Sequence, residues 1–173
     1  GGEWHPGDVL QTAIGQSDNL FTPAQLASYI STVLNKGTRY KLHLVNKIVD
    51  YDSGEVVKEF GSEVMSENPI SDETFEAVKD GMRRVVADGT ASSVFNGSKL
   101  KVGGKTGTAQ VSDGADNVLF AGFAPYDDPQ IVVAVVIEHG ENSGYAAQVA
   151  KSMFESYLLD ESEASPAPDE EDE

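Results

Sequence analysis

The sequence contains no cysteine among its 173 residues, which excludes disulfide bonds, cysteine-ligated zinc and a thiol nucleophile. Basic residues are scarce: 12 Lys and Arg stand against 29 Asp and Glu. The resulting net charge of −17 repels a phosphate backbone, so we expect no nucleic-acid partner. The three histidines, His5, His43 and His139, lack metal-ligand spacing, and we expect neither a metal nor a cofactor. No run approaches the roughly 20 apolar residues of a membrane span, so any anchor is expected outside this chain.

The carboxy-terminal stretch ESEASPAPDEEDE differs in composition from everything before it. It carries seven acidic residues, no basic residue and two prolines. Such a segment cannot bury a core, so we predict that it is disordered. We therefore expect one folded unit over residues 1–160 and an acidic tail over residues 161–173.

Two local patterns in the first half predict regular structure. The run TPAQLASYISTVLNKG predicts a helix in which Thr22 is the cap, Pro23 occupies the first helical position and Gly37 ends the segment. Two extended runs then flank Asp52-Ser53-Gly54, which predicts a hairpin with a purely structural turn.

A second helix is predicted from Ser71 to Gly89, with an apolar face made of Phe75, Val78, Met82, Val85 and Val86. Three extended runs follow, around residues 101–111, 119–124 and 131–137. The seven consecutive apolar residues of the third run predict a strand covered on both faces.

A final helix over 145–159 is expected to cover this sheet with Ala146, Val149, Met153 and Tyr157. The expected fold class is α+β, with antiparallel strands flanked by helices.

The stretch KVGGKTGTAQV, residues 101–111, can be interpreted in three ways. A phosphate-binding loop would need a glycine where Lys99 stands and a helix after Lys105, whereas TGTAQVSDG is typical of a strand and turn, so we disfavour a nucleotide site. The Lys-Thr-Gly motif of serine acyltransferases fits better. Lys105 would provide positive charge, Thr106 and Thr108 would provide hydroxyl donors, and Gly107 would leave room for substrate. The short motif alone leaves a glycine turn as a third interpretation.

Longer blocks decide between these interpretations, and they extend from Trp4 to Leu159. They include WHPGD at residues 4–8, TPAQLA at 22–27, VVADGT at 85–90, GKTGTAQ at 104–110 and GFAPYDDPQ at 122–130. Together these blocks resemble the class B penicillin-binding proteins. The ending VVIEHG followed by GYAAQVAK is most similar to the elongation-type branch, penicillin-binding protein 2.

The resemblance implies a penicillin-binding, serine β-lactamase-like fold and a D,D-transpeptidase that cross-links peptidoglycan stem peptides ending in D-Ala-D-Ala. It implies a serine acyl-enzyme that β-lactams also form. It places the protein at the extracytoplasmic face of the bacterial membrane, beside a membrane glycosyltransferase of the elongation machinery. By motif position, Lys105, Thr106 and Thr108 would bind the terminal carboxylate, and the Thr108 N–H would form half of the oxyanion hole.

The family's nucleophile lies in Ser-x-x-Lys. We expect no serine of this chain to be followed three residues later by lysine, and we therefore expect the nucleophile to be absent. Ser17-Asp18-Asn19 matches the family's Ser-x-Asn motif but stands at the wrong place in the order of blocks, so we interpret it as a coincidence. We therefore expect the carboxy-terminal part of a transpeptidase domain, inactive alone. The alternatives are a non-catalytic binding or scaffold module of the same fold and a serine β-lactamase-like hydrolase.

In the family's five-stranded sheet, strands from before the nucleophile lie beside the strand that matches residues 131–137. We expect that strand to have an open edge here. An open apolar edge predicts self-association by strand exchange, aggregation, or capping by another segment of the chain.

Overall fold

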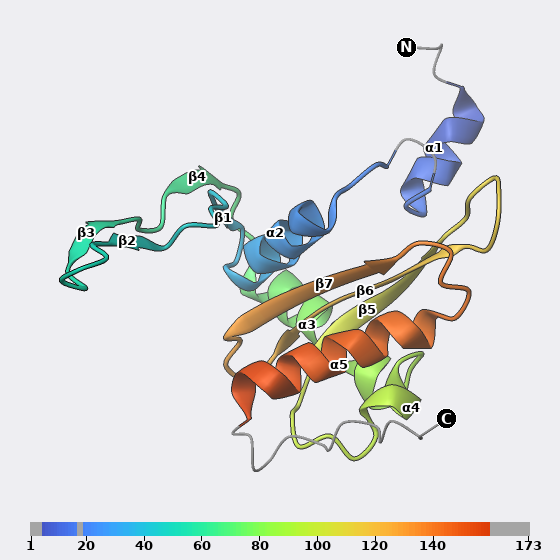
Figure 1. Ribbon diagram of the computed structural model, residues 1–173. Helices are drawn as coiled ribbons and strands as arrows, with labels where there is room; N and C mark the ends of the chain where they lie inside the picture. The colour runs from blue at the N-terminus through green and yellow to red at the C-terminus, as the bar shows by residue number, and fades with distance from the viewer. Residues whose placement is uncertain (1–4, 17–18, 160–173) are drawn as a thin grey trace.

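A computed structural model of the protein describes residues 5–16 and 19–159. Its centre is an antiparallel sheet with the strand order β5-β6-β7 (Figure 1). The bounds of these strands are β5 Gly103–Ala109, β6 Asn117–Ala124 and β7 Ile131–Ile137. Both pairings run without a bulge. The expected α+β class and the three extended runs are confirmed.

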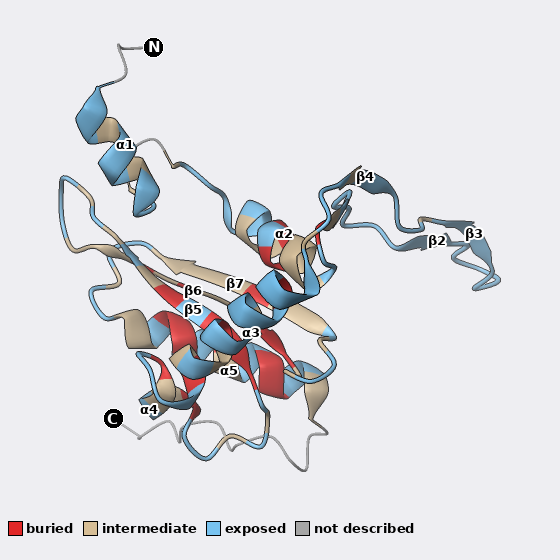
Figure 2. Cartoon of the chain, turned by 180° about the vertical axis from the view of Figure 1, so that it is seen from behind, coloured by how far each residue is buried: buried red, intermediate tan, exposed pale blue. Residues whose placement is uncertain are grey.

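Helices cover both faces of this sheet. On one face lie α5 (Ser143–Leu158) and the short α4 (Ser92–Phe95), which bury Phe120, Val133 and Phe154 in the larger core cluster. On the other face lie α2 (Pro23–Leu34) and α3 (Asp72–Ala87), with Phe123 at the centre of a smaller cluster. Figure 2 shows the buried residues gathered in the sheet and in α5. Side chains of the strands alternate between these two clusters, as the pleat requires.

The predicted starts of α2 and α3 are confirmed at the level of single hydrogen bonds. The hydroxyl of Thr22 accepts from the Gln25 N–H at 3.2 Å, and the Gln25 side chain accepts from the Thr22 N–H at 2.8 Å. Ser71 caps α3 by accepting from the Thr74 N–H at 3.2 Å. After α2, Gly37 has a φ of +98°, and a Cβ on it would lie 1.8 Å from the Asn68 carbonyl oxygen. Only glycine fits at that position.

An extended ribbon projects from the body between α2 and α3 (Figure 1). Its two pairs are β1 (Thr38–Tyr40) with β4 (Val64–Glu67), and β2 (Lys47–Val49) with β3 (Val56–Glu59). The predicted hairpin turn is confirmed between β2 and β3. Hydrogen bonds from Ser53 hold the pKa of the Asp50 carboxyl below its usual range. Strands β1 and β4 were not predicted.

The predicted contact face of α5 is confirmed for Ala146 and wrong for its other three residues. Val149, Met153 and Tyr157 are 44%, 46% and 66% exposed, whereas the fully buried residues are Ala146, Ala147, Ala150 and Phe154. This helix has two apolar stripes, and the stripe rich in alanine packs on the sheet because small side chains let the helix backbone approach closely. The expectation for α3 is also partly wrong, because Val78 is 43% exposed.

Strand β7 is covered less completely than its sequence predicts. Both α2 and α5 contact it, yet only Val133 is fully buried among its seven residues. The reason is its place in the sheet: within the described residues β7 pairs with β6 alone and forms an edge. The predicted open edge is therefore confirmed for this part of the chain.

Helix α1 (Pro6–Ala13) was not predicted from the sequence, although Pro6 occupies its first position. Figure 1 shows it apart from the main body. Of the Ser17-Asp18-Asn19 match, only Asn19 is described. Its side chain donates to the carbonyl oxygens of Thr12 and Gln16 at 2.8 and 3.1 Å, a local loop contact. Trp4, Ser17, Asp18 and the predicted tail lie outside the described residues.

Candidate functional site

The motif residues Lys105 to Thr108 lie inside strand β5, which is the other edge of the central sheet. Lys105 is paired with Ala121 of β6, and Thr108 with Val118. The glycine-turn interpretation is therefore wrong, because the stretch is a regular strand from Gly103 to Ala109. A phosphate loop is also excluded, because a strand and not a helix contains and follows Lys105.

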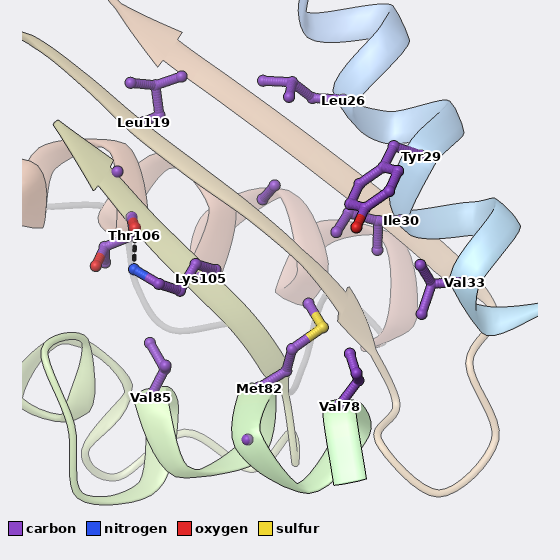
Figure 3. Close-up of a pocket in the computed structure, with 13 residues that line it drawn as sticks. Leu26, Tyr29, Ile30, Val33, Val78, Met82, Val85, Lys105, Thr106 and Leu119 are labelled. Atoms are coloured by element: carbon purple, nitrogen blue, oxygen red, sulfur yellow. Dashed lines mark hydrogen bonds between the residues drawn. The ribbon is translucent and has the colours of Figure 1, made fainter. Parts of the chain in front are cut away.

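Lys105 and Gly107 face a cleft of about 420 Å³ between α2, α3 and the sheet (Figure 3). The cleft is walled almost entirely by apolar side chains, and its lining residues include Leu26, Ile30, Met82, Val85 and Leu119. Of the described residues that line it, Lys105 alone is charged. Its ammonium group donates to the backbone carbonyl oxygen of Thr106 at 2.6 Å. A cation beside a low-polarity wall is a suitable place for an anionic group.

The side chains of Thr106 and Thr108 project to the opposite face of the same strand, because side chains alternate along it, while Thr106 also lines the cleft beside Lys105. Thr106 is only 8% exposed, and its hydroxyl is hydrogen-bonded to the Thr90 hydroxyl at 2.8 Å. Thr108 is exposed. The structure thus separates the four predicted residues: the ammonium group lies on one side of the β5 edge and the two hydroxyls lie on the other.

Thr90 was not predicted as a site residue, although it ends the VVADGT block. Gly89 before it is required by packing, since a Cβ there would lie 2.8 Å from the Val85 Cα. The close turn after α3 therefore brings the Thr90 hydroxyl to Thr106. This contact is tertiary, so spacing within the sequence could not have revealed it.

The glycines of β5 fall into two kinds. A Cβ on Gly103 would lie 2.5 Å from the Phe123 ring, and a Cβ on Gly104 would lie 2.4 Å from the Phe120 ring. Packing therefore excludes a side chain at both positions. A Cβ on Gly107 would make its nearest contact at 3.4 Å, with the Leu119 Cβ, which is an ordinary distance. The fold does not need glycine at position 107, which leaves its bare backbone available to a ligand at the cleft.

One Ser-x-x-Lys spacing does occur in the chain, from Ser98 to Lys101, and it corrects the expectation that none would be found. The structure gives both residues other partners. The Ser98 hydroxyl donates to the Glu155 carboxylate at 3.1 Å, and the Lys101 ammonium pairs with Asp127 at 2.9 Å. Neither residue lines the cleft. Their contacts attach the loop after α4 to α5 and to the loop after β6.

Comparison with known proteins matches residues 1–158 to the penicillin binding protein transpeptidase domain. Among curated proteins, penicillin-binding protein 2A of Bacillus subtilis is 32% identical over 171 residues, which cover 88% of this chain and 24% of that protein. Peptidoglycan D,D-transpeptidase MrdA of Acinetobacter baumannii is 32% identical over 176 residues, covering 91% of this chain and 25% of that protein.

Among solved structures, penicillin-binding protein 2B of Streptococcus pneumoniae superposes with a TM-score of 0.79 at 30% identity, covering 91% of this chain and 28% of that chain. The similarity therefore extends over nearly the whole chain. This chain spans about a quarter of the length of the curated relatives that it matches.

Proposed function

This chain belongs to the penicillin-binding protein transpeptidase family, with relatives of the penicillin-binding protein 2 type, and we propose which portion of the transpeptidase domain it forms and what that portion does. Residues 1–160 form the carboxy-terminal portion of a D,D-transpeptidase domain, and residues 161–173 are an acidic tail. The chain supplies the wall of the site that holds the substrate's terminal carboxylate. The nucleophilic serine belongs to a part of the domain outside this chain.

The observation that carries this proposal is the open edge of β5. Lys105, Thr106 and Gly107 line the cleft at that edge, and the side chains of Thr106 and Thr108 project to the other face of the strand. Alternate residues of a strand present their backbone groups at the same edge. If the Thr106 carbonyl oxygen that accepts from Lys105 points to the open edge, the Thr108 N–H points there too. An extended peptide along this edge would then meet a backbone donor, an ammonium group and two hydroxyls.

In the proposed reaction, the serine oxygen attacks the carbonyl carbon between the two terminal D-alanines of a stem peptide. The developing oxyanion accepts a hydrogen bond from the Thr108 N–H, which stabilises the tetrahedral intermediate. The Thr106 and Thr108 hydroxyls and Lys105 hold the carboxylate of the departing D-alanine. Release of that D-alanine leaves an acyl-enzyme, and an amine of a neighbouring strand resolves it. A β-lactam would acylate the same serine and direct its own carboxylate to the same wall.

This assignment also implies a location and a partner, which we include in the proposal. The intact protein would act at the extracytoplasmic face of the bacterial membrane beside a glycosyltransferase that makes the glycan strands. Within residues 5–16 and 19–159, no helix is both long and apolar enough to cross a membrane.

Labelling with a fluorescent penicillin tests the proposal. The 173-residue chain should take up no covalent label, because the activated serine is absent from it. The longer protein, recovered by extending the reading frame upstream, should encode Ser-x-x-Lys and take up one label per molecule. Stoichiometric label on the short chain, or none on the longer protein, would contradict the proposal. The second result would favour a non-catalytic module of the same fold.

In the longer protein, Thr108→Val keeps the volume and the strand propensity of the side chain but removes its hydroxyl. A hydrogen bond to a charged group is worth about 1.5–3 kcal/mol, so the acylation rate constant should fall about ten- to over one-hundred-fold. Thr38→Val, in strand β1 of the ribbon, is the matched control and should acylate at the parental rate. Equal rates for both variants would show that the Thr108 hydroxyl does not bind the carboxylate.

A further inference from the structure

The loop that follows the motif strand is held against a second loop at the same end of the central sheet. Residues 110–116 connect β5 to β6 and begin two residues after Thr108, whereas residues 138–142 connect β7 to α5. The strand pairings place both connections at one end of the sheet. Figure 1 shows the first loop, in yellow, extending beyond that end.

His139 makes the central contact between the two loops. Its backbone N–H donates to the side-chain oxygen of Asn117 at 3.0 Å, and its ring Nδ1 lies 3.0 Å from the Ala115 carbonyl oxygen. Because a carbonyl oxygen can only accept, Nδ1 carries the proton in this contact. Beside it, the Glu141 N–H donates to the Asp116 carbonyl oxygen at 3.3 Å. His139 therefore holds the neighbouring loop through its backbone and through its ring.

The backbone on both sides of the contact has the shape that the imidazole ring needs. His139 has a φ of +53° and Glu141 a φ of +58°, which is a conformation that L residues rarely adopt. Gly114 has a φ of +85°, and a Cβ on it would lie 2.8 Å from the His139 Nδ1. A Cβ on Gly140 would lie 2.5 Å from a methyl carbon of Val118. Such backbone conformations persist only where the surrounding contacts determine them, so this connection is a built contact and not a chance approach of two loops.

The charges of the two loops oppose their contact. Together the loops carry four carboxylates and no lysine or arginine; the four are Asp113, Asp116, Glu138 and Glu141. Like charges repel each other, so the loops would separate if nothing held them. The hydrogen bonds centred on His139 offset this repulsion.

The contact reaches the motif strand through the first pairs of the β5–β6 ladder. Asn117, which accepts from the His139 N–H, lies opposite Ala109, and Val118 lies opposite Thr108. Thr108 is the last residue but one of β5. The end of a strand opens readily unless tertiary contacts hold it. His139 thus holds the part of the sheet that fixes the position of the Thr108 backbone.

We propose that His139 is a positioning residue for acyl transfer, because it clamps the loop over residues 110–116 and keeps the Thr108 N–H where the oxyanion develops. This inference rests on the proposed function, in which that N–H stabilises the tetrahedral intermediate. His139 does not line the cleft and acts only through Asn117 and the loop. A donor that is needed in the transition state affects the acylation step more than the non-covalent complex before it.

His139→Gly tests the proposal in the longer protein, because glycine adopts a positive φ freely and only the ring is lost. At saturating fluorescent penicillin the acylation rate constant should fall about tenfold, whereas the dissociation constant of the non-covalent complex should change less than about twofold. His139→Asn should restore most of the rate, since asparagine tolerates a positive φ and can place an amide N–H where Nδ1 lies.

His43→Gly is the matched control for the loss of a histidine ring. The His43 ring makes the same kind of contact, at 2.9 Å from the Val45 carbonyl oxygen, but in the ribbon between β1 and β2. This variant should acylate at the parental rate. Equal slowing by His43→Gly and His139→Gly, or equal slowing by His139→Gly and His139→Asn, would overturn the proposal.

Hydrogen exchange of the same variants reports on the clamp without any reaction. Peptides that cover residues 107–118 should exchange faster in His139→Gly and at the parental rate in His43→Gly. Unchanged exchange in His139→Gly would overturn the proposal, because His139 would then not hold the loop. Faster exchange with parental acylation would overturn this inference alone, because the clamp would be purely structural. A parent protein that takes up no penicillin would refute the proposed function, and this inference with it.

Discussion

Replacing Gly104 by alanine and replacing Gly107 by alanine should have opposite consequences, although the two residues lie on the same strand. The Cβ of an alanine at position 104 would lie 2.4 Å from the tip of the Phe120 ring. Phe120 is 1% exposed and its ring centre lies 5.6 Å from that of Phe95, so the ring has no free space into which it can move. Alanine at position 107 would instead make its closest contact at 3.4 Å, with Leu119.

The expected magnitudes follow from these distances. Inserting a methyl group into a filled core typically costs about 1–3 kcal/mol of unfolding free energy. For a chain of this size each kcal/mol lowers the melting temperature by about 2–4 °C, so Gly104→Ala should lower it by about 2–12 °C. Gly107→Ala meets no clash and restricts the unfolded chain, so its unfolding free energy should be unchanged or raised by up to about 1 kcal/mol.

Thermal and urea unfolding of the 173-residue chain, followed by circular dichroism, measure both effects. The dependence of the unfolding free energy on urea concentration should be the same for the parent and the two variants. Equal slopes would indicate that all three unfold from the same folded state. In the longer protein, Gly107→Ala should slow acylation by penicillin although it leaves stability intact. If Gly107→Ala destabilises the chain as much as Gly104→Ala, then position 107 is a packing glycine and the reasoning about an accessible backbone is refuted.

Two further predictions concern single contacts of the described residues. Thr90→Val removes the hydroxyl partner of Thr106 and should lower the unfolding free energy by about 0.5–1.5 kcal/mol. Thr90→Ser keeps a hydroxyl at this position and should keep the hydrogen bond. Equal losses of unfolding free energy for the two variants would contradict a role for that hydrogen bond. The hydrogen bond between Lys36 and Asp72 lowers the pKa of the Asp72 carboxyl and raises that of the Lys36 ammonium. The stabilisation from Asp72 is therefore present above the ordinary aspartate pKa of about 3.9 and is lost as the pH falls through its lowered value. The difference in melting temperature between the parent and Asp72→Asn should be steady near neutral pH and should shrink as the pH falls below the ordinary aspartate pKa; a difference that is the same in strong acid as at neutral pH would contradict this pairing.

Local sequence determined much of the fold because local physics is sufficient for it. The cap at Thr22, the cap at Ser71 and the turn at Asp52-Ser53-Gly54 depend on neighbouring residues, and all three occur where they were predicted. The apolar runs likewise predicted the strands of the central sheet. The family blocks predicted the transpeptidase family, because they extend over most of the chain and not over one short motif.

Tertiary structure alone decided which apolar face is buried and which residues meet. Helix α5 has two apolar stripes. The stripe rich in alanine is buried because its small side chains let the helix pack closely on the sheet, whereas Val149, Met153 and Tyr157 stay exposed. The contact between Thr90 and Thr106 depends on how the turn after α3 reaches β5. Alternation along β5 is local, but which of its two faces meets the cleft, and therefore that the Lys105 side chain projects into it, depends on the strand order and on the helices around the sheet. Each of these features depends on distances between segments that are remote in the sequence, and no local pattern encodes such distances.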